Sequence, residues 1–292
     1  MNVSTSEAHL SSSFFTQKTR LKWGLPLLGL VLISLLWFMA TIKKDNLLFD
    51  VSEITRVPFF ETHYLYIYAH IFAIFPILCL SFDKKVAFYK TWKYLIPALF
   101  IVAIPYWIWD IIKTDTQVWG FNPEYYTFKI LNLPIEEWLF FITFPFASIF
   151  IYECLNAYFP NSKIFNTLKR IDTPLSIGLI FFFFGLSFLY FNHKYTMTTF
   201  LIGGFILLWQ FLFGSQETRL LFYRMFPIAT IPFILVNGVF TGGFTEQPIV
   251  VYNPEEYLGI RFFTIPVDDF NYNFGLELAV IMVYEKLKNN RF

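Results

Sequence analysis

Charged residues are scarce in this 292-residue chain. They make up 15% of it, against about 25% in ordinary soluble domains, whereas hydrophobic residues make up 56%. So few charges leave too little polar surface for a soluble protein of this size, and the composition favours a membrane protein. The formal net charge is only +1, and no basic patch with interleaved aromatic residues occurs, so nucleic-acid binding is not indicated.

Sequence signals for common cofactors and metals are also missing. Cys79 and Cys154 lie in separate apolar stretches and predict neither a disulfide framework nor a metal site. No Gly-x-Gly-x-x-Gly follows a strand and no Walker-type loop occurs, so a flavin or nicotinamide is not expected. His63, His70 and Glu61 are dispersed and have no matching set elsewhere, so no metal site is predicted. We expect redox-neutral chemistry without a cofactor.

Long apolar runs are abundant. Each is near the length of about 17–25 residues that a membrane-spanning helix needs, and a backbone in lipid must satisfy its own hydrogen bonds. We therefore predict an all-α integral membrane protein with about eight transmembrane helices. The runs are Leu21–Ile42, His63–Phe82, Tyr94–Ile112, Pro134–Tyr152, Leu175–Tyr190, Met197–Phe213, Tyr223–Phe240 and Pro266–Tyr284.

The N-terminal region divides into two parts. Residues 1–20 are polar and rich in Ser and Thr, which predicts a disordered tail. Leu21–Ile42 exceeds the apolar core of a signal peptide and lacks a small-x-small cleavage site, so we interpret it as a retained membrane anchor.

Lysine and arginine are unevenly distributed among the segments between the apolar runs. The two tails and the connections near 83–93, 153–174 and 214–224 hold 15 of them, and the four other connections hold 7. Because positive residues favour the cytoplasm, both termini are predicted to be cytoplasmic in a multi-pass protein of the cell membrane.

A short acidic motif occurs twice, each time at the start of an apolar run. Pro134–Glu137 (Pro-Ile-Glu-Glu) recurs 132 positions later as Pro266–Asp269 (Pro-Val-Asp-Asp). Upstream, Phe121–Glu124 (Phe-Asn-Pro-Glu) recurs 131 positions later as Tyr252–Glu255 (Tyr-Asn-Pro-Glu). Further matching pairs are Tyr126 with Tyr257, Lys129 with Arg261, Tyr152 with Tyr284, Glu153 with Glu285 and Asp110 with Asn237.

These matches predict two copies of one multi-helix unit. We assign the first copy to residues 21–158 and the second to residues 175–292, with a linker at 159–174. Four helices separate the two motifs. Because this number is even, both motifs should open helices from the same, outer side of the membrane, in parallel repeats.

The acid pairs allow two interpretations. Carboxylates in a first helical turn meet the positive end of the helix dipole, and proline suits that turn, so the pairs could serve stability alone. Alternatively, two adjacent carboxyl groups in an apolar setting cannot both ionise cheaply, so one should keep a proton. Such an acid can protonate an apolar substrate, and aromatic faces can stabilise the resulting cation.

The chemical interpretation gives three groups of candidate residues. The catalytic candidates are Glu136, Glu137, Asp268 and Asp269. The candidates for contact with substrate and cation are Trp119, Tyr126, Trp138, Tyr257 and Phe270. The secondary candidates are Asp110, Glu124, Asn237, Glu255, Arg261 and Glu277.

The repeated Pro-x-acid-acid motif, with Asn122–Tyr125 ahead of the first copy and Gly259–Arg261 ahead of the second, resembles the lycopene cyclase domain of the heterodimer and fungal types. The resemblance covers about residues 60–292, with two halves that are separate chains in some bacteria fused into one. The second copy has Asp268 where the family usually has Glu, and no phytoene-synthase-like part is attached.

The resemblance implies a function and partners. The ψ ends of lycopene, or of a related linear carotenoid from the bilayer, would be closed into β-ionone rings without net redox change. The two acid pairs would be catalytic. Membrane lipid, other carotenoid-pathway enzymes and a second copy of the chain are the remaining expected partners. The choice between β and ε rings stays open, as does closure of one end or both.

Three other functions also stay open. A transporter is built from repeats too, although here the acids cluster at one face and only Glu277 lies deep. A UbiA-like prenyltransferase would need Asp-rich motifs for Mg²⁺ and diphosphate, but no acid follows Asp269 until Glu277. A non-catalytic carotenoid-binding subunit would have the same sequence features.

Overall fold

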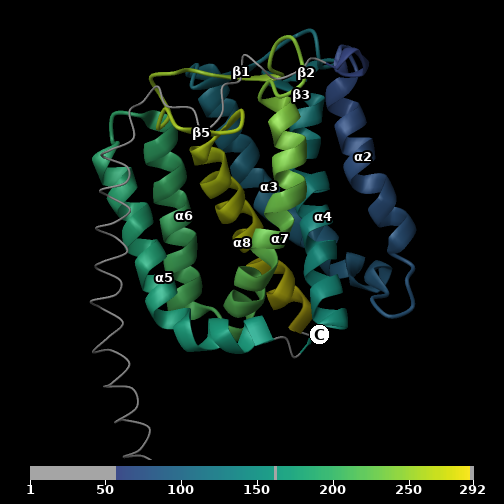
Figure 1. The fold of residues 1–292 in the computed structure, drawn as a ribbon, viewed down its shortest axis with the longest axis vertical. Coiled ribbons are helices and arrows are strands. Elements are labelled where there is room, and N and C mark those ends of the chain that lie inside the picture. Colours follow the sequence, from purple (N-terminus) through teal and green to yellow (C-terminus); the bar gives the residue numbers. More distant parts are fainter. Residues whose placement is uncertain (1–56, 161–162, 290–292) are drawn as a thin grey trace, which may run out of the picture.

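The computed structural model describes residues 57–160 and 163–289, which form a helical bundle with short strands at one end (Figure 1). The described α-helices are α2 (Leu65–Leu80), α3 (Trp92–Asp115), α4 (Ile135–Tyr158), α5 (Lys163–Leu189), α6 (Lys194–Phe213), α7 (Gln216–Phe240) and α8 (Val267–Asn289). Two 3₁₀ turns, η2 (Pro58–Phe60) and η3 (Phe88–Thr91), precede α2 and α3. The predicted tail and the run Leu21–Ile42 lie outside the described residues.

Five helices in the described part of the chain are long and apolar enough to cross a membrane, namely α4 to α7 and α3 with the turn before it. The protein is therefore an all-α membrane protein. Helix α2 has 16 residues and is shorter than these. Helix α8 is more polar, because Asp268, Asp269 and Glu277 are among its buried residues. It packs against α3, α4, α6 and α7, so these side chains face protein.

The helices lie where the apolar runs predict them, and α5 is much longer at its N-terminal end than its predicted run. Each predicted run after residue 57 falls within a helix, give or take a few terminal residues. Helix α5, however, begins at Lys163, within the segment assigned to the linker. Asp172 is buried there against Arg219 of α7, so this polar stretch packs as a helix. Pro174 follows, and the first turns of α5 lie across the end of the bundle (Figure 1).

Short antiparallel strand pairs hold the other end of the bundle together. β1 (Trp119–Phe121) pairs with β4 (Val250–Tyr252), β2 (Lys129–Ile130) with β3 (Leu133–Pro134), and β5 (Arg261–Phe262) with β6 (Ile265–Pro266). The last two pairs are equivalent hairpins, one in each copy, and each ends on the proline that precedes α4 or α8. They place the start of both helices at the strand end of the bundle (Figure 1).

The two copies contact each other through equivalent residues. In the β1–β4 pair, Gly120 lies opposite Val251, which is 131 positions later and thus its counterpart in the repeat. Far from these strands, the Tyr152 hydroxyl donates to Glu285 over 3.0 Å and the Tyr284 hydroxyl donates to Glu153 over 2.6 Å. Each of these bonds is the repeat counterpart of the other. Both contacts therefore join equivalent positions of the repeated sequence segments.

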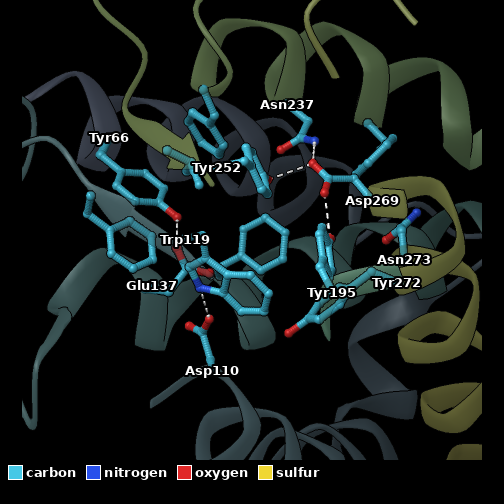
Figure 2. Close-up of a pocket in the computed structure, with 15 residues that line it drawn as sticks. Tyr66, Asp110, Trp119, Glu137, Tyr195, Asn237, Tyr252, Asp269, Tyr272 and Asn273 are labelled. Atoms are coloured by element: carbon cyan, nitrogen blue, oxygen red, sulfur yellow. Dashed lines mark hydrogen bonds between the residues drawn. The ribbon is translucent and has the colours of Figure 1, made fainter. Parts of the chain in front are cut away.

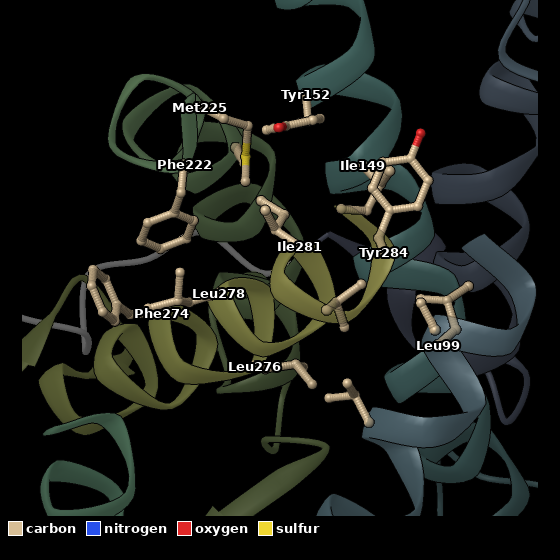
Figure 3. Packing of buried hydrophobic residues seen from close by; sticks show 14 of the residues in the cluster. Leu99, Ile149, Tyr152, Phe222, Met225, Phe274, Leu276, Leu278, Ile281 and Tyr284 are labelled. Carbon is tan, nitrogen blue, oxygen red and sulfur yellow. The ribbon is translucent and has the colours of Figure 1, made fainter. Parts of the chain in front are cut away.

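The main hydrophobic core lies between the helices of the two copies. Figure 3 shows Phe274, Leu278 and Ile281 of α8 packed with Phe222 of α7, while Ile149 of α4 lies on the other side. Lipid tails are as apolar as these side chains, so van der Waals packing, rather than removal from water, is what holds such helices together within a membrane. This core fixes α4 and α8 relative to each other, and so fixes the acids at their starts.

Candidate active site

The first turns of α4 and α8 direct the two acids of each pair to different surroundings. Successive residues of an α-helix point about 100° apart, so adjacent side chains do not share a direction. Glu136 and Asp268 face the loops that precede their helices, while Glu137 and Asp269 face the middle of the bundle. The two adjacent acids of each motif therefore form hydrogen bonds with different groups.

Glu136 and Asp268 anchor the preceding loops. Glu136 accepts hydrogen bonds from the backbone N–H of Thr127 (3.0 Å) and from its hydroxyl (2.8 Å). Asp268 accepts from the backbone N–H of Leu258 (3.3 Å) and from the hydroxyl of Thr196 on α6 (2.5 Å). Thr127 and Leu258 are counterparts in the repeat, 131 positions apart. Both residues are fully buried, and the second carboxyl oxygen of Glu136 has no partner among the described residues.

Glu137 and Asp269 line one central pocket, together with Asp110 of α3 (Figure 2). The three residues are 8%, 6% and 2% exposed. The cavity itself has a volume of about 50 Å³, and both copies contribute to its wall. Its aromatic wall consists of Tyr66, Trp119, Phe121, Phe140, Tyr195, Phe233, Phe240, Tyr252 and Tyr272. The repeat thus builds one shared site, with one acid from each motif.

Asp269 is surrounded by hydrogen-bond donors. It accepts from the hydroxyls of Tyr195 (2.5 Å) and Tyr252 (2.7 Å) and from the side-chain amide of Asn237 (2.9 Å), as Figure 2 shows. Bonds of this kind compensate a carboxylate for its lost water. Burial, together with the Asp269 charge, raises the pKa of the Tyr252 hydroxyl on β4 well above its usual range, so Tyr252 remains a donor.

The acids of the first copy have fewer donors. Glu137 accepts a hydrogen bond from the hydroxyl of Tyr66. Asp110 accepts one from the indole N–H of Trp119 (2.7 Å), and its second oxygen is buried without a partner among the described residues. Two carboxyl groups in an aromatic pocket with one donor each are poorly compensated as two charges. The pocket is therefore asymmetric, and the position of Asp110 corresponds to Asn237 in the second copy.

A family model described as lycopene cyclase matches residues 63–155 and 192–287. The matched segments cover more than half of the chain, and each contains one acid motif. The chain belongs to the lycopene cyclase family. Neither the comparison with curated proteins nor the comparison with solved structures finds a match.

In this lycopene cyclase family member, the aromatic candidates occupy several places. Trp119 lines the central pocket. Tyr126 and Tyr257 lie instead beneath the cations Lys129 and Arg261, each about 5.1 Å from the ring centroid. They stabilise the loops by cation–π contact. The two aromatic residues that follow the acid pairs also lie outside the pocket wall: Trp138 donates to the carbonyl of Ile130, and Phe270 contacts Phe233 of α7.

Some of the secondary candidates line the pocket and others lie outside it. Asp110 and Asn237 belong to the pocket, as described. Glu124 and Glu255 have exposed side chains, and their backbone carbonyls accept hydrogen bonds from His63 (3.2 Å) and His193 (2.7 Å). Glu277 is buried on α8 but does not line the pocket, and one of its oxygens has no partner within the described residues.

The site residues predicted from the sequence did not include three tyrosines whose hydroxyls donate hydrogen bonds to Glu137 or Asp269. Tyr66 precedes Glu137 by 71 residues, and Tyr195 precedes Asp269 by 74, so a comparison at one fixed offset does not align them. Tyr252 was visible as part of the second Asn-Pro-Glu motif, but its aromatic counterpart Phe121 has no hydroxyl. Tyr252 could have been predicted, because a polar residue in a repeated loop is a candidate for contact with the repeated acids.

His63 and His70 make hydrogen bonds within the fold of this family member. His70 shares a 2.6 Å hydrogen bond with the Thr143 hydroxyl, and His63 holds the carbonyl of Glu124. Within residues 57–160 and 163–289, no group of three His, Cys, Asp or Glu side chains is arranged to hold a metal ion.

Proposed function

We propose that the protein closes the ψ end groups of lycopene, or of a related linear carotenoid, into β-ionone rings by proton transfer in the central pocket. Family membership supports carotenoid cyclase activity of the isomerase type in general. The assignment of the reaction to this site rests on one observation: Glu137 and Asp269, one acid from each copy, line the same aromatic pocket.

The first step assigns the proton donor. Glu137 and Asp110 share the less compensated side of the pocket, so one proton is retained between them, and Glu137 delivers it to the terminal double bond of the ψ end. The proton forms a C–H bond and leaves a tertiary carbocation. The double bond that lies four carbons further along attacks this cation, which closes a six-membered ring and moves the positive charge into the ring.

The second step returns the proton. Asp269, whose three donors hold it as a carboxylate, takes a proton from the ring carbon next to the cation, and the C–H electrons form the ring double bond. The product is an isomer of the substrate, so no oxidant or reductant is consumed. Because both acids line one pocket, the proton can pass back from Asp269 to Glu137 for the next turnover.

The aromatic wall protects the cation. The ring of Trp119 lies 4.9 Å from that of Tyr195, and Tyr272 contacts both. Aromatic faces attract a cation and exclude the water that would trap it as an alcohol. A volume of about 50 Å³ is close to that of one or two water molecules, so an end group enters only when wall side chains such as Phe233 rotate.

The same proposal includes the membrane arrangement. The copies run parallel, with about eight spans in all, both termini in the cytoplasm and the acid motifs near the outer face of a cell membrane. The reciprocal bonds of Tyr152 and Tyr284, and the Gly120–Val251 contact, support the parallel course of the copies alone, because each joins equivalent positions at the same end of the bundle.

Expression in lycopene-accumulating bacteria tests the function. We expect the red pigment to be converted into a compound with the chromatographic mobility and absorption of β-carotene, and the Glu137→Gln variant to leave lycopene unchanged at equal membrane protein level. Persistence of lycopene with the wild-type protein in the membrane would refute the cyclase, and an ε-ring product would refute the β assignment.

A further inference from the structure

A long apolar groove lies on the side of α8 opposite the central pocket. Asp269, Tyr272 and Asn273 line the pocket, whereas Phe270 and Phe274, among others, line the groove. The groove has a volume of about 470 Å³, which is within the range of about 300–1,000 Å³ for small-molecule sites. Helices α5, α6 and α7 supply its other walls.

The groove is elongated along the helices. On α5 its wall extends from Leu168 to Leu186, and the part after Pro174, from Leu175 to Leu186, corresponds to about 17 Å of helix. At the strand end it reaches Val267, the first residue of α8, and away from that end it reaches Tyr223 near the start of α7. Its shape therefore suits a rod-like hydrocarbon that lies roughly along the membrane normal.

The chemistry of the walls favours an occupant without a polar head group. The hydroxyl of Tyr223 is hydrogen-bonded to Ser176 (2.8 Å), and the amide of Asn271 donates to the Thr199 carbonyl (2.8 Å). Arg219, one turn before Tyr223, is held by Asp172 over 2.5 Å and 2.8 Å. Its charge is thus already paired and does not offer a site for a lipid phosphate.

Two phenylalanines separate the groove from the central pocket. Phe270 lines the groove and Phe233 lines the pocket, and their ring centroids are 5.3 Å apart in an edge-on contact. Neither side chain is fully buried. Rotation of these rings would therefore join the two spaces between α7 and α8.

We propose that the groove binds the unreacted length of the linear polyene while one end group occupies the central pocket. This inference rests on the proposed function, because it assigns a place to the remainder of the same substrate. The pocket holds only the reacting end, and the groove supplies an apolar aromatic surface for the conjugated chain. Passage between them runs past Phe233 and Phe270.

The amount of lycopene bound to an inactive variant tests the proposal without catalytic turnover. The Glu137→Gln protein is purified from lycopene-accumulating bacteria, and lycopene per protein is read from absorbance of the monodisperse fraction. Leu175→Trp and Leu179→Trp, each added to Glu137→Gln, place a large ring in the groove and should lower bound lycopene at least tenfold. Phe181→Trp is the matched control, because Phe181 lies on the same helix and is 62% exposed; it should change binding less than twofold.

The outcomes separate the two proposals. Full lycopene binding by both groove variants, or a phospholipid acyl chain recovered in place of lycopene, would overturn the groove assignment while leaving the cyclase intact. Conversely, loss of pigment in the groove variants together with a wild-type protein that binds lycopene but forms no ring would support the groove and refute the cyclase.

Discussion

Glu136 and Glu137 are adjacent in the sequence, yet their carboxyl groups meet different neighbours. The first is held by the loop residue Thr127, and the second faces Asp110 and Asp269 across the pocket. The same division separates Asp268 from Asp269. Under the proposed function, the doubled acid in each motif combines a structural anchor with a chemical group, and substitutions should distinguish them.

Glu137→Gln should lower the rate of cyclisation by about 10²–10⁴-fold, because an amide cannot donate the proton that starts the reaction. Glu136→Gln should retain most activity, since an amide oxygen can still accept the hydrogen bonds from Thr127. Product formation per membrane protein is the measurement. Equal losses in the two variants would contradict the division of roles.

Asp110→Asn should slow cyclisation by about tenfold or more, because the amide removes the second carboxyl group between which and Glu137 the retained proton is shared. The variant would also make this position identical to Asn237 of the second copy. Asp115→Asn is the control on the same helix, where Asp115 is exposed and accepts from Asn132. A rate for Asp110→Asn within twofold of wild type would remove Asp110 from the mechanism.

At the scale of helices and strands, α6 and α8 are joined by buried polar contacts as well as by packing. The Thr196 hydroxyl donates to Asp268, and the Thr199 carbonyl accepts from Asn271. These bonds set the rotation of α8 at its first turns. They therefore decide that Asp269 faces the central pocket, where Tyr195 of the same helix α6 also reaches it.

Thr196→Val should destabilise the protein by about 1–3 kcal/mol, because it leaves the buried Asp268 with one donor fewer and changes little in shape. Thr198→Val is the matched control, since the Thr198 hydroxyl bonds only to backbone carbonyls of its own helix. Thermal unfolding in detergent measures both. Equal melting temperatures for the two variants would contradict the anchoring role of Asp268.

The sequence was informative about helices and the repeat, for physical reasons. Apolar runs must become helices in lipid, and the repeated motif marks the starts of two of them, so the sequence located the helix ends that carry Glu137 and Asp269. The extra turns of α5 were missed because Asp172 and Arg219, which are 47 residues apart, stabilise them only through tertiary contact. For the same reason, sequence could not show that Glu136 turns away from the pocket.

At the scale of the whole molecule, the two copies are parts of one site. Glu137 and Tyr66 come from the first copy, and Asp269, Tyr195 and Asn237 come from the second. Helices also pack across the copies, as α3 does on α8 and α4 on α7. Neither copy can therefore form a complete pocket alone.

Dividing the chain after Pro160 should give two inactive fragments that regain cyclase activity when they are expressed together. The interface between the copies has an apolar core and reciprocal tyrosine–glutamate bonds, which favour reassembly. Pigment chromatography of cells with one or both fragments measures this. Ring formation by a single fragment would contradict a shared site.

A single pocket on the boundary between the copies also bears on substrates whose two termini are identical. Under the proposed function, one terminus is processed in each visit, so such a molecule must leave the pocket, reverse its direction and enter again. The half-finished compound then exists as a separate species that competes with fresh starting material. An abundant supply of the latter should therefore enrich singly closed pigment, and a limiting supply should drive the mixture to the doubly closed form.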